Sequence, residues 1–405
     1  MIYDDVGEKK LVAIAVLILI SSIMLLFYSP LLFFLCIAII SPSIEEPLRV
    51  LIKPIVLVIA ITFFSSLKPF ADLAEYLSIY HQLGDGSISV FSYQRFGFGF
   101  EFVYLLFMKI ISIISNVNDQ VLLISTYSLI FILICKISSV AEKRFSILFF
   151  GLFFFSLGFV ETASYFIRQI LSITFFFYGL IYCKSKTARA FLFLLSLFSH
   201  LSAIINIAIY IGYSLSKNNR KWMWVFAFSA VGVAAIIGMT PFFDVAIQKM
   251  NDTALNSNFS TMPIAYILLT TVNVMFILGV NYGCKIKGGI FSFIFLKEVF
   301  LFYLLLPYPA LSNRVSMIIF SFYPVFLFPL LSNVNVSVRK KNSILLLMLI
   351  INLPPYLYAM KNISSSGNLY TFYQNRPFTE SLYGVFSYFD EAITNGVKYI
   401  NDGNK

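Results

Sequence analysis

Long apolar runs separated by short polar segments form the main pattern of this 405-residue chain. A helix needs about 17–25 mostly apolar residues to cross the hydrocarbon core of a bilayer. Runs of this kind lie at 11–28, 30–42, 50–66, 120–138, 145–160, 164–183, 188–199, 201–215, 221–240, 263–282, 290–307, 315–332 and 343–358. The runs 30–42 and 188–199 are short, which is typical of tilted, broken or re-entrant helices. The pattern predicts an all-α, polytopic membrane protein with about 12–13 transmembrane helices.

Basic residues gather in alternate loops between these runs, and the positive-inside rule places such loops in the cytoplasm. The basic loops lie at 8–10, 49–53, 142–144, 184–189, 217–221, 285–287 and 339–341. Alternation then places 67–97, 161–168, 241–262 and 308–314 outside, with the tail 359–405. Residues 98–116 are also apolar, but a crossing there would turn the basic segment 142–144 outward. We therefore interpret 98–116 as an interfacial or re-entrant helix on the outer side.

Composition excludes a soluble domain, because a chain that is 59% hydrophobic and 12% charged cannot bury that much apolar surface. We expect one integral membrane domain, 1–405, with outer-face loops 67–118 and 241–262 and an outer amphipathic tail 359–405. The net charge of +10 marks cytoplasmic loops rather than nucleic-acid binding. No nucleotide-binding fingerprint is present, and neither the four cysteines nor the two histidines form a metal-ligand pattern. We expect no cofactor and no metal.

Carboxylates in the first outer loop are candidates for acid–base chemistry. Asp72 and Glu75 share one face of a helix, with Tyr76 alongside. They could act as base and orienter or hold a cation, or they could be solvated acids at a helix start. Glu101 begins the helix expected over 98–116. It is either another helix-start acid or a carboxylate that faces the same cavity as Asp72.

Arginines at the outer ends of spans are the strongest polar signal, because the positive-inside rule predicts few there. Arg168 and Arg314 hold such positions at two separate spans, and Arg95 adds to the outer-face charge. A guanidinium suits bidentate binding of phosphate or pyrophosphate, although a snorkelling arginine is the alternative. His200 lies at an outer turn between two short apolar runs. It could donate to phosphate or carry a proton, or be a packed structural residue.

The order of these residues resembles that of a known family. The chain presents Asp72-x-x-x-Tyr76, Glu101, Arg168-Gln169, His200-x-Ser202-Ala203 and Arg314. This order is similar to that of the EpsG/Wzy family of bacterial polysaccharide polymerases, and it covers roughly residues 67–330. The family often has a proline after the glutamate, where this chain has Phe102.

The resemblance implies a GT-C-like fold and a polyprenyl-pyrophosphate-dependent glycosyltransferase, as in O-antigen (lipopolysaccharide) and exopolysaccharide synthesis. Such an enzyme transfers a growing glycan from undecaprenyl pyrophosphate to the non-reducing end of a lipid-linked repeat unit. It lies in the bacterial inner membrane with its active site facing the periplasm, and it uses no nucleotide sugar. Its expected partners are the lipid-linked donor and acceptor and the bilayer. Whether a chain-length regulator binds is left open.

Carried onto this chain, the resemblance implies that Arg168 and Arg314 clamp the donor pyrophosphate. Asp72 or Glu101 would be the general base in an inverting displacement, and His200 a phosphate donor or second base. Tyr76, Gln169 and Arg95 are further candidate substrate-binding residues.

Other functions remain open. A flippase or transporter for lipid-linked glycans should show pseudo-symmetric halves with broken helices, and the sequence shows none. An O-antigen ligase-type glycosyltransferase typically has a larger late outer loop than 241–262. A purely structural membrane partner would have little use for outward arginines.

Overall fold

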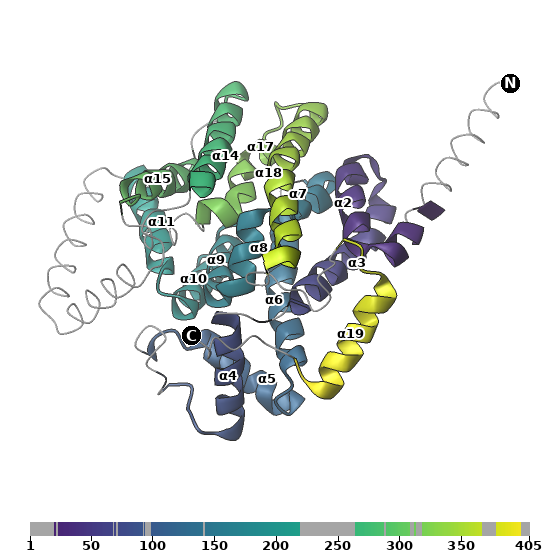
Figure 1. Ribbon diagram of the computed structural model, residues 1–405. Helices are drawn as coiled ribbons and strands as arrows, with labels where there is room; N and C mark the ends of the chain where they lie inside the picture. Colours follow the sequence, from purple (N-terminus) through teal and green to yellow (C-terminus); the bar gives the residue numbers. More distant parts are fainter. Residues whose placement is uncertain are drawn as a thin grey trace, which may run out of the picture.

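The computed structural model describes residues 20–21, 23–67, 69, 72–91, 93, 99–140, 142–218, 264–286, 289–307, 312, 318–366 and 378–397. Within these ranges the chain consists of helices and turns, with no β-strand, which confirms the all-α prediction (Figure 1). The α-helices are α2 (Pro30–Ile40), α3 (Glu46–Ser65), α4 (Asp72–Asp85), α5 (Val103–Ser115), α6 (Asp119–Ser138), α7 (Ser146–Phe154), α8 (Leu157–Tyr165), α9 (Ile167–Ile181), α10 (Lys186–Ser199), α11 (Ala203–Asn218), α14 (Ile264–Gly283), α15 (Ile290–Leu304), α17 (Phe328–Ser332), α18 (Val338–Ser366) and α19 (Leu382–Asn395). Short 3₁₀ helices are η1 (Ser41–Ser43), η3 (Lys143–Phe145) and η4 (Tyr323–Leu327).

Among the described residues, α3, α6 and α14 are each 20 residues long and apolar enough to cross a membrane. Shorter apolar helices accompany them, including α5 and α9. The chain is thus an all-α, polytopic membrane protein, while the total of about 12–13 spans stays a prediction. The predicted outer loop 241–262 lies outside the described residues.

The predicted run 145–160 is not one straight span. It is divided into η3–α7 and α8, which are bent by 66° relative to each other and together match a broken span or a re-entrant loop. The break comes at Phe155 and Ser156, where the backbone leaves helical geometry. Phe155 is fully buried and packs edge-on against Tyr356 of α18, with ring centroids 5.6 Å apart. Because this packing comes from distant parts of the chain, local hydrophobicity could not reveal the bend.

Aromatic side chains build the centre of the bundle. Phe64 of α3 contacts Phe131 of α6 and Phe154 of α7, with ring centroids 5.1 and 5.8 Å apart. Phe159 of α8 closes the group with an edge-on contact to Phe64 at 6.0 Å. These rings are fully buried, and their tilted and edge-on geometry is the favoured arrangement for aromatic pairs. The cluster therefore fixes α3, α6, α7 and α8 relative to one another.

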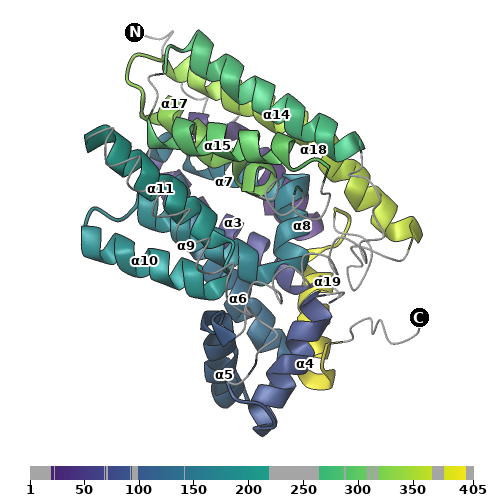
Figure 2. The ribbon, with the colours of Figure 1, turned by 90° about the vertical axis from the view of Figure 1, so that its left-hand side faces the viewer.

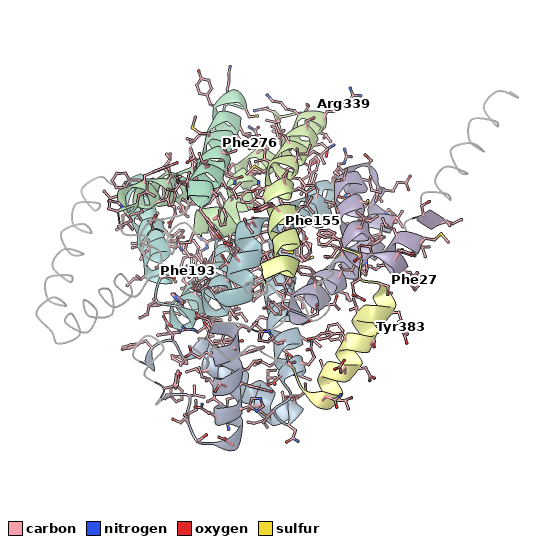
Figure 3. The ribbon with its side chains drawn as sticks, viewed as in Figure 1. Phe27, Phe155, Phe193, Phe276, Arg339 and Tyr383 are labelled. Atoms are coloured by element: carbon pink, nitrogen blue, oxygen red, sulfur yellow. The ribbon has the colours of Figure 1, made fainter. Side chains whose placement is uncertain are left out.

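The segments expected as outer loops and tail contain helices that gather at one end of the molecule. Both views place α4, α5 and α19 there (Figures 1 and 2). Helix α19 buries Tyr388, whose hydroxyl donates to the Gln120 side chain of α6 at 3.4 Å. Its other face exposes Phe386 and Tyr383, and Tyr383 points away from the bundle in Figure 3. Helix α19 thus has one packed face and one exposed apolar face.

Candidate functional site

The α9–α10 hairpin brings two of the predicted site residues to the same end of the bundle. Ser172 and Ser196 each donate a side-chain hydrogen bond to the other's backbone carbonyl, at 2.8 and 2.7 Å. Gly179 permits the close approach, since an added Cβ would lie 3.1 Å from the Cβ of Leu192. The register of this antiparallel pair places the start of α9 beside the end of α10. Arg168 and His200 are therefore neighbours in space, as their positions along the two runs predict.

Arg168 lies at the first turn of α9, directly after a break in the chain. Phe166 has φ −111° and ψ 52°, which ends α8 and begins α9. Residues 161–168 are predicted to form an outer loop, but they are helical apart from Phe166. They belong to α8 and α9, and α8 packs against residues 318–322. A hydrogen bond holds α8 in this position, because the Ser321 hydroxyl donates to the carbonyl of Gly158 at 2.8 Å. The bend aims the Arg168 side chain toward α4.

Arg168 is held by an acid and a phenol from two other segments. Its Nη1 forms an ion pair with Glu101, and its Nε donates to the Tyr76 hydroxyl at 3.2 Å. The guanidinium also lies 5.5 Å from the centre of the Tyr76 ring, within the range of a cation–π contact. The Arg168 and Glu101 side chains are 14% and 6% exposed. A charge pair this deep keeps a defined geometry, because either partner alone would be a costly buried charge.

Glu101 connects three parts of the chain. It precedes α5, which begins at Val103, so the expectation that Glu101 begins the helix is corrected. One carboxylate oxygen accepts from Arg168, and the other accepts from the backbone N–H of Leu201 at 2.8 Å. Glu101 thus ties the outer segment before α5 to α9 and to the α10–α11 turn. No sequence signal marks the Leu201 N–H as a partner.

Tyr76 is buried on α4 and remains a neutral phenol. Burial raises the pKa of Tyr76 to about 12, and the positive charge of Arg168 only partly opposes this effect. The negative charges of Asp72 and Glu75 raise the pKa further. Tyr76 therefore accepts from Arg168 without becoming an anion. Asp72 is half-buried at the start of α4, one turn before Tyr76, so the predicted face of Asp72, Glu75 and Tyr76 is present.

His200 ends α10 and turns back on its own loop. Its Nδ1 accepts the backbone N–H of Ser202 at 3.2 Å and lies 2.8 Å from the Ser202 hydroxyl. A neutral imidazole whose Nδ1 is an acceptor carries its proton on Nε2. The His200-x-Ser202 spacing therefore sets the tautomer, with the proton on Nε2.

The remaining predicted residues have different outcomes. Gln169 is buried on α9, next to Arg168. Arg95 and Arg314 lie outside the described residues, so their roles stay predictions. Among the side chains that the structure describes, no three His, Cys, Asp or Glu residues gather as a metal site.

Sequence reasoning did not single out one acid near this end. Glu161 of α8 is half-buried and accepts from the Tyr266 hydroxyl of α14. The signal available was a carboxylate between two apolar runs, seven residues before Arg168. It adds an acid to the α8–α9 region, where we expect substrate to bind.

No curated protein and no solved structure matches the chain. A family match covers residues 50–375 and includes every residue of the site described above. Membership in that family supports a polysaccharide polymerase-like glycosyltransferase role for this membrane protein. The arginine held at a helix start by an acid and a phenol thus occurs in a chain that belongs to the EpsG family.

Proposed function

We propose that the protein is a polyprenyl-pyrophosphate-dependent polysaccharide polymerase. It transfers a growing glycan from undecaprenyl pyrophosphate to the non-reducing end of a lipid-linked repeat unit at the periplasmic face of the inner membrane. The observation that carries this proposal is Arg168. Its guanidinium is oriented by Glu101 and Tyr76 at the end of α9 away from the basic segment 184–189. Because α9 has 15 residues, these ends lie about 22 Å apart.

Arg168 suits a pyrophosphate for two reasons. A guanidinium has five N–H donors in one plane, and Tyr76 and Glu101 accept two of them. Holding that plane in place before substrate arrives lowers the cost of orienting it in the transition state. We expect Arg168 to stabilise the negative charge that develops on the pyrophosphate, with Arg314 as the second arginine of the clamp. His200 adds a neutral Nε2–H donor for a phosphate oxygen.

The carboxylates then take separate roles in the proposal. Glu101 accepts from both Arg168 and the Leu201 N–H, so it is a positioning residue for the guanidinium. Asp72, half-buried one turn before Tyr76, is the better general base. The acceptor hydroxyl oxygen attacks C1 of the donor sugar, and Asp72 takes the hydroxyl proton. The bond between C1 and the pyrophosphate oxygen breaks, its electron pair leaves with the pyrophosphate, and C1 is inverted.

The test uses cells that lack the native polymerase and express variants of the full chain. Arg168→Ala and Arg168→Lys should both abolish long polymer, because an ammonium cannot reproduce the planar contacts. Single repeat units should still be displayed outside. Lys186→Ala, an exposed change at the other end of the same hairpin, is the control and should give normal polymer.

Asp72→Asn provides an independent variant, since it removes the proposed base without leaving Glu101 unpaired. It should lose polymer while retaining normal insertion and thermal stability. Normal-length polymer from a folded, inserted Arg168→Ala protein would refute the clamp. Loss of even single repeat units outside would instead indicate a flippase.

A further inference from the structure

A second charged region lies at the basic end of the molecule, where positive-inside predicts the cytoplasm. A cavity of about 790 Å³ opens there, lined by residues from the start of α3, from the η3 turn and from the start of α18. Arg49, Arg144 and Arg339 are among its lining residues. Figure 3 shows Arg339 at the first turn of α18, at the surface of the bundle. None of these residues contributes to the site around Arg168.

Arg49 is the buried part of this cavity. Arg49 is 8% exposed, and its Nη2 donates to the carbonyl of Ile44 at 2.6 Å. The Arg49 Nε is buried and has no hydrogen-bond partner. A buried guanidinium N–H without an acceptor is unfavourable, and an anion in the cavity would supply one.

The other charges of the cavity divide into paired and unpaired groups. Lys143 pairs with Glu46 at 3.2 Å, and Glu142 pairs with Lys341 at 2.9 Å. Within the part of the chain that the structure describes, neither Arg144 nor Arg339 forms an ion pair. The guanidinium groups of the cavity therefore exceed its unpaired carboxylates, of which Glu45 is one.

Helix ends add to the positive potential. Helix α3 begins at Glu46, η3 at Lys143 and α18 at Val338, and all three residues line the cavity. The N-terminus of a helix carries a partial positive charge and N–H groups that bind anions. Neither α3 nor η3 has a side-chain cap on these groups, whereas in α18 the Ser337 hydroxyl accepts from the Lys340 N–H at 3.3 Å. The cavity thus combines unpaired arginines with helix N-termini.

Exposed apolar side chains lie on the first turns of α3, near the cavity. Leu48, Val50 and Leu51 flank Arg49 in sequence and are 41%, 63% and 67% exposed. Because α3 is long and apolar enough to cross a membrane, a lipid with its headgroup in the cavity would lay its acyl chains on these side chains. Basic pockets between helices on the cytoplasmic side are known sites for anionic headgroups.

We propose that this cavity binds the phosphate group of an anionic phospholipid, with Arg49 at its base and Arg144 and Arg339 at its rim. The proposal is independent of the proposed glycosyl transfer, because its residues and its readout are separate from that reaction. Arg144 and Arg339 are exposed and make no ion pair with any described residue, so we expect their replacement to leave the fold intact.

The experiment measures lipid retention by the purified full-length protein in detergent, using native mass spectrometry with phosphatidylglycerol or phosphatidylcholine. The double variant Arg144→Gln/Arg339→Gln should retain phosphatidylglycerol about tenfold more weakly than the unmodified protein. Phosphatidylcholine retention should not change. The control Lys184→Gln/Lys186→Gln removes the same charge from another exposed loop on the same side and should behave like the unmodified protein.

A competition arm with inorganic phosphate separates the two sources of a phosphate group. Millimolar phosphate should displace phosphatidylglycerol from the unmodified protein, and this displacement should be lost in the Arg144→Gln/Arg339→Gln variant. That result supports a phosphate site that a lipid occupies. Phosphate binding without any preference for phosphatidylglycerol over phosphatidylcholine would overturn the lipid assignment. Equal losses in both double variants would show only non-specific charge attraction, and no loss in either would refute the site.

Discussion

The two ends of the molecule differ in the exposure and pairing of their charged side chains. At the end that is predicted to face outward, called the outer end, Arg168 and Glu101 are 14% and 6% exposed and form an ion pair with each other. At the basic end, Lys143 and Glu46 pair while 80% and 59% exposed, and among the described residues the exposed Arg144 and Arg339 form no ion pair. A buried charge needs a partner with defined geometry, whereas an exposed charge gains little from pairing. The outer site is therefore preorganised, and the basic cavity is available to an anion from outside the chain.

This difference means that Arg168 has two roles, which experiments must separate. Its partners hold α4, α9 and the α10–α11 turn together. The same partners orient the guanidinium that we expect to meet pyrophosphate. A variant of this site can thus fail by unfolding or by losing chemistry, while a variant of Arg144 or Arg339 should lose only the proposed ligand.

The largest effect is expected from unpairing the buried site. Glu101→Ala leaves Arg168 without its carboxylate and should reduce the free energy of unfolding by about 3–5 kcal/mol. Thermal unfolding in detergent measures this loss. The double variant Glu101→Leu/Arg168→Met removes both charges and should recover most of the stability while remaining inactive. A double variant no more stable than Glu101→Ala would show that the pair is not the cause.

A smaller effect is expected at the most buried charge of the basic end. Lys341 is 7% exposed, and its Nζ donates to Glu142 at 2.9 Å and to the carbonyl of Leu331 at 2.8 Å. Lys341→Met keeps the packing but removes both bonds, so it should cost about 2 kcal/mol. Because Glu142 is 26% exposed, water can partly replace Lys341. A cost as large as that of Glu101→Ala would contradict the proposed contrast between the two ends.

Tyr76→Phe should have a milder effect at the outer site. It removes the acceptor for the Arg168 Nε but keeps the ring under the guanidinium. We expect a stability loss of about 1 kcal/mol and reduced polymer length, because the guanidinium loses one of its orienting contacts. Chemical unfolding and polymer gels from the same cells report the two effects. Unchanged polymer together with unchanged stability would exclude Tyr76 from the site.

The smallest effect on stability is expected at the exposed pair of Lys143 and Glu46. Lys143→Gln breaks the pair with Glu46, and we expect a stability change below about 1 kcal/mol. Polymer formation should be normal. The same thermal unfolding assay as for Glu101→Ala allows a direct comparison. A loss near that of Glu101→Ala would mean that exposure does not distinguish the two ends.

The apolar runs alone determined the class of this protein. Segments such as 50–66 and 120–138 are long enough to span a bilayer, and the structure has α3 and α6 there. The placement of Arg168 and His200 at the same end also follows from the sequence, since two antiparallel runs joined by a basic loop must return to the same side. The order of the polar residues likewise resembles that of the EpsG family, and the family match agrees.

Only the tertiary structure decided which groups meet. The bend at Phe155 depends on packing against Tyr356, about 200 residues later, and no local pattern encodes it. Glu101 finds its partners in Arg168 and in the Leu201 N–H, and a backbone donor carries no residue-type signal. The basic cavity arises because the starts of three distant helices converge. The length of the apolar runs specifies which segments enter the membrane, because burial of apolar surface is additive along the chain. Charge pairing instead depends on positions that only folding brings together.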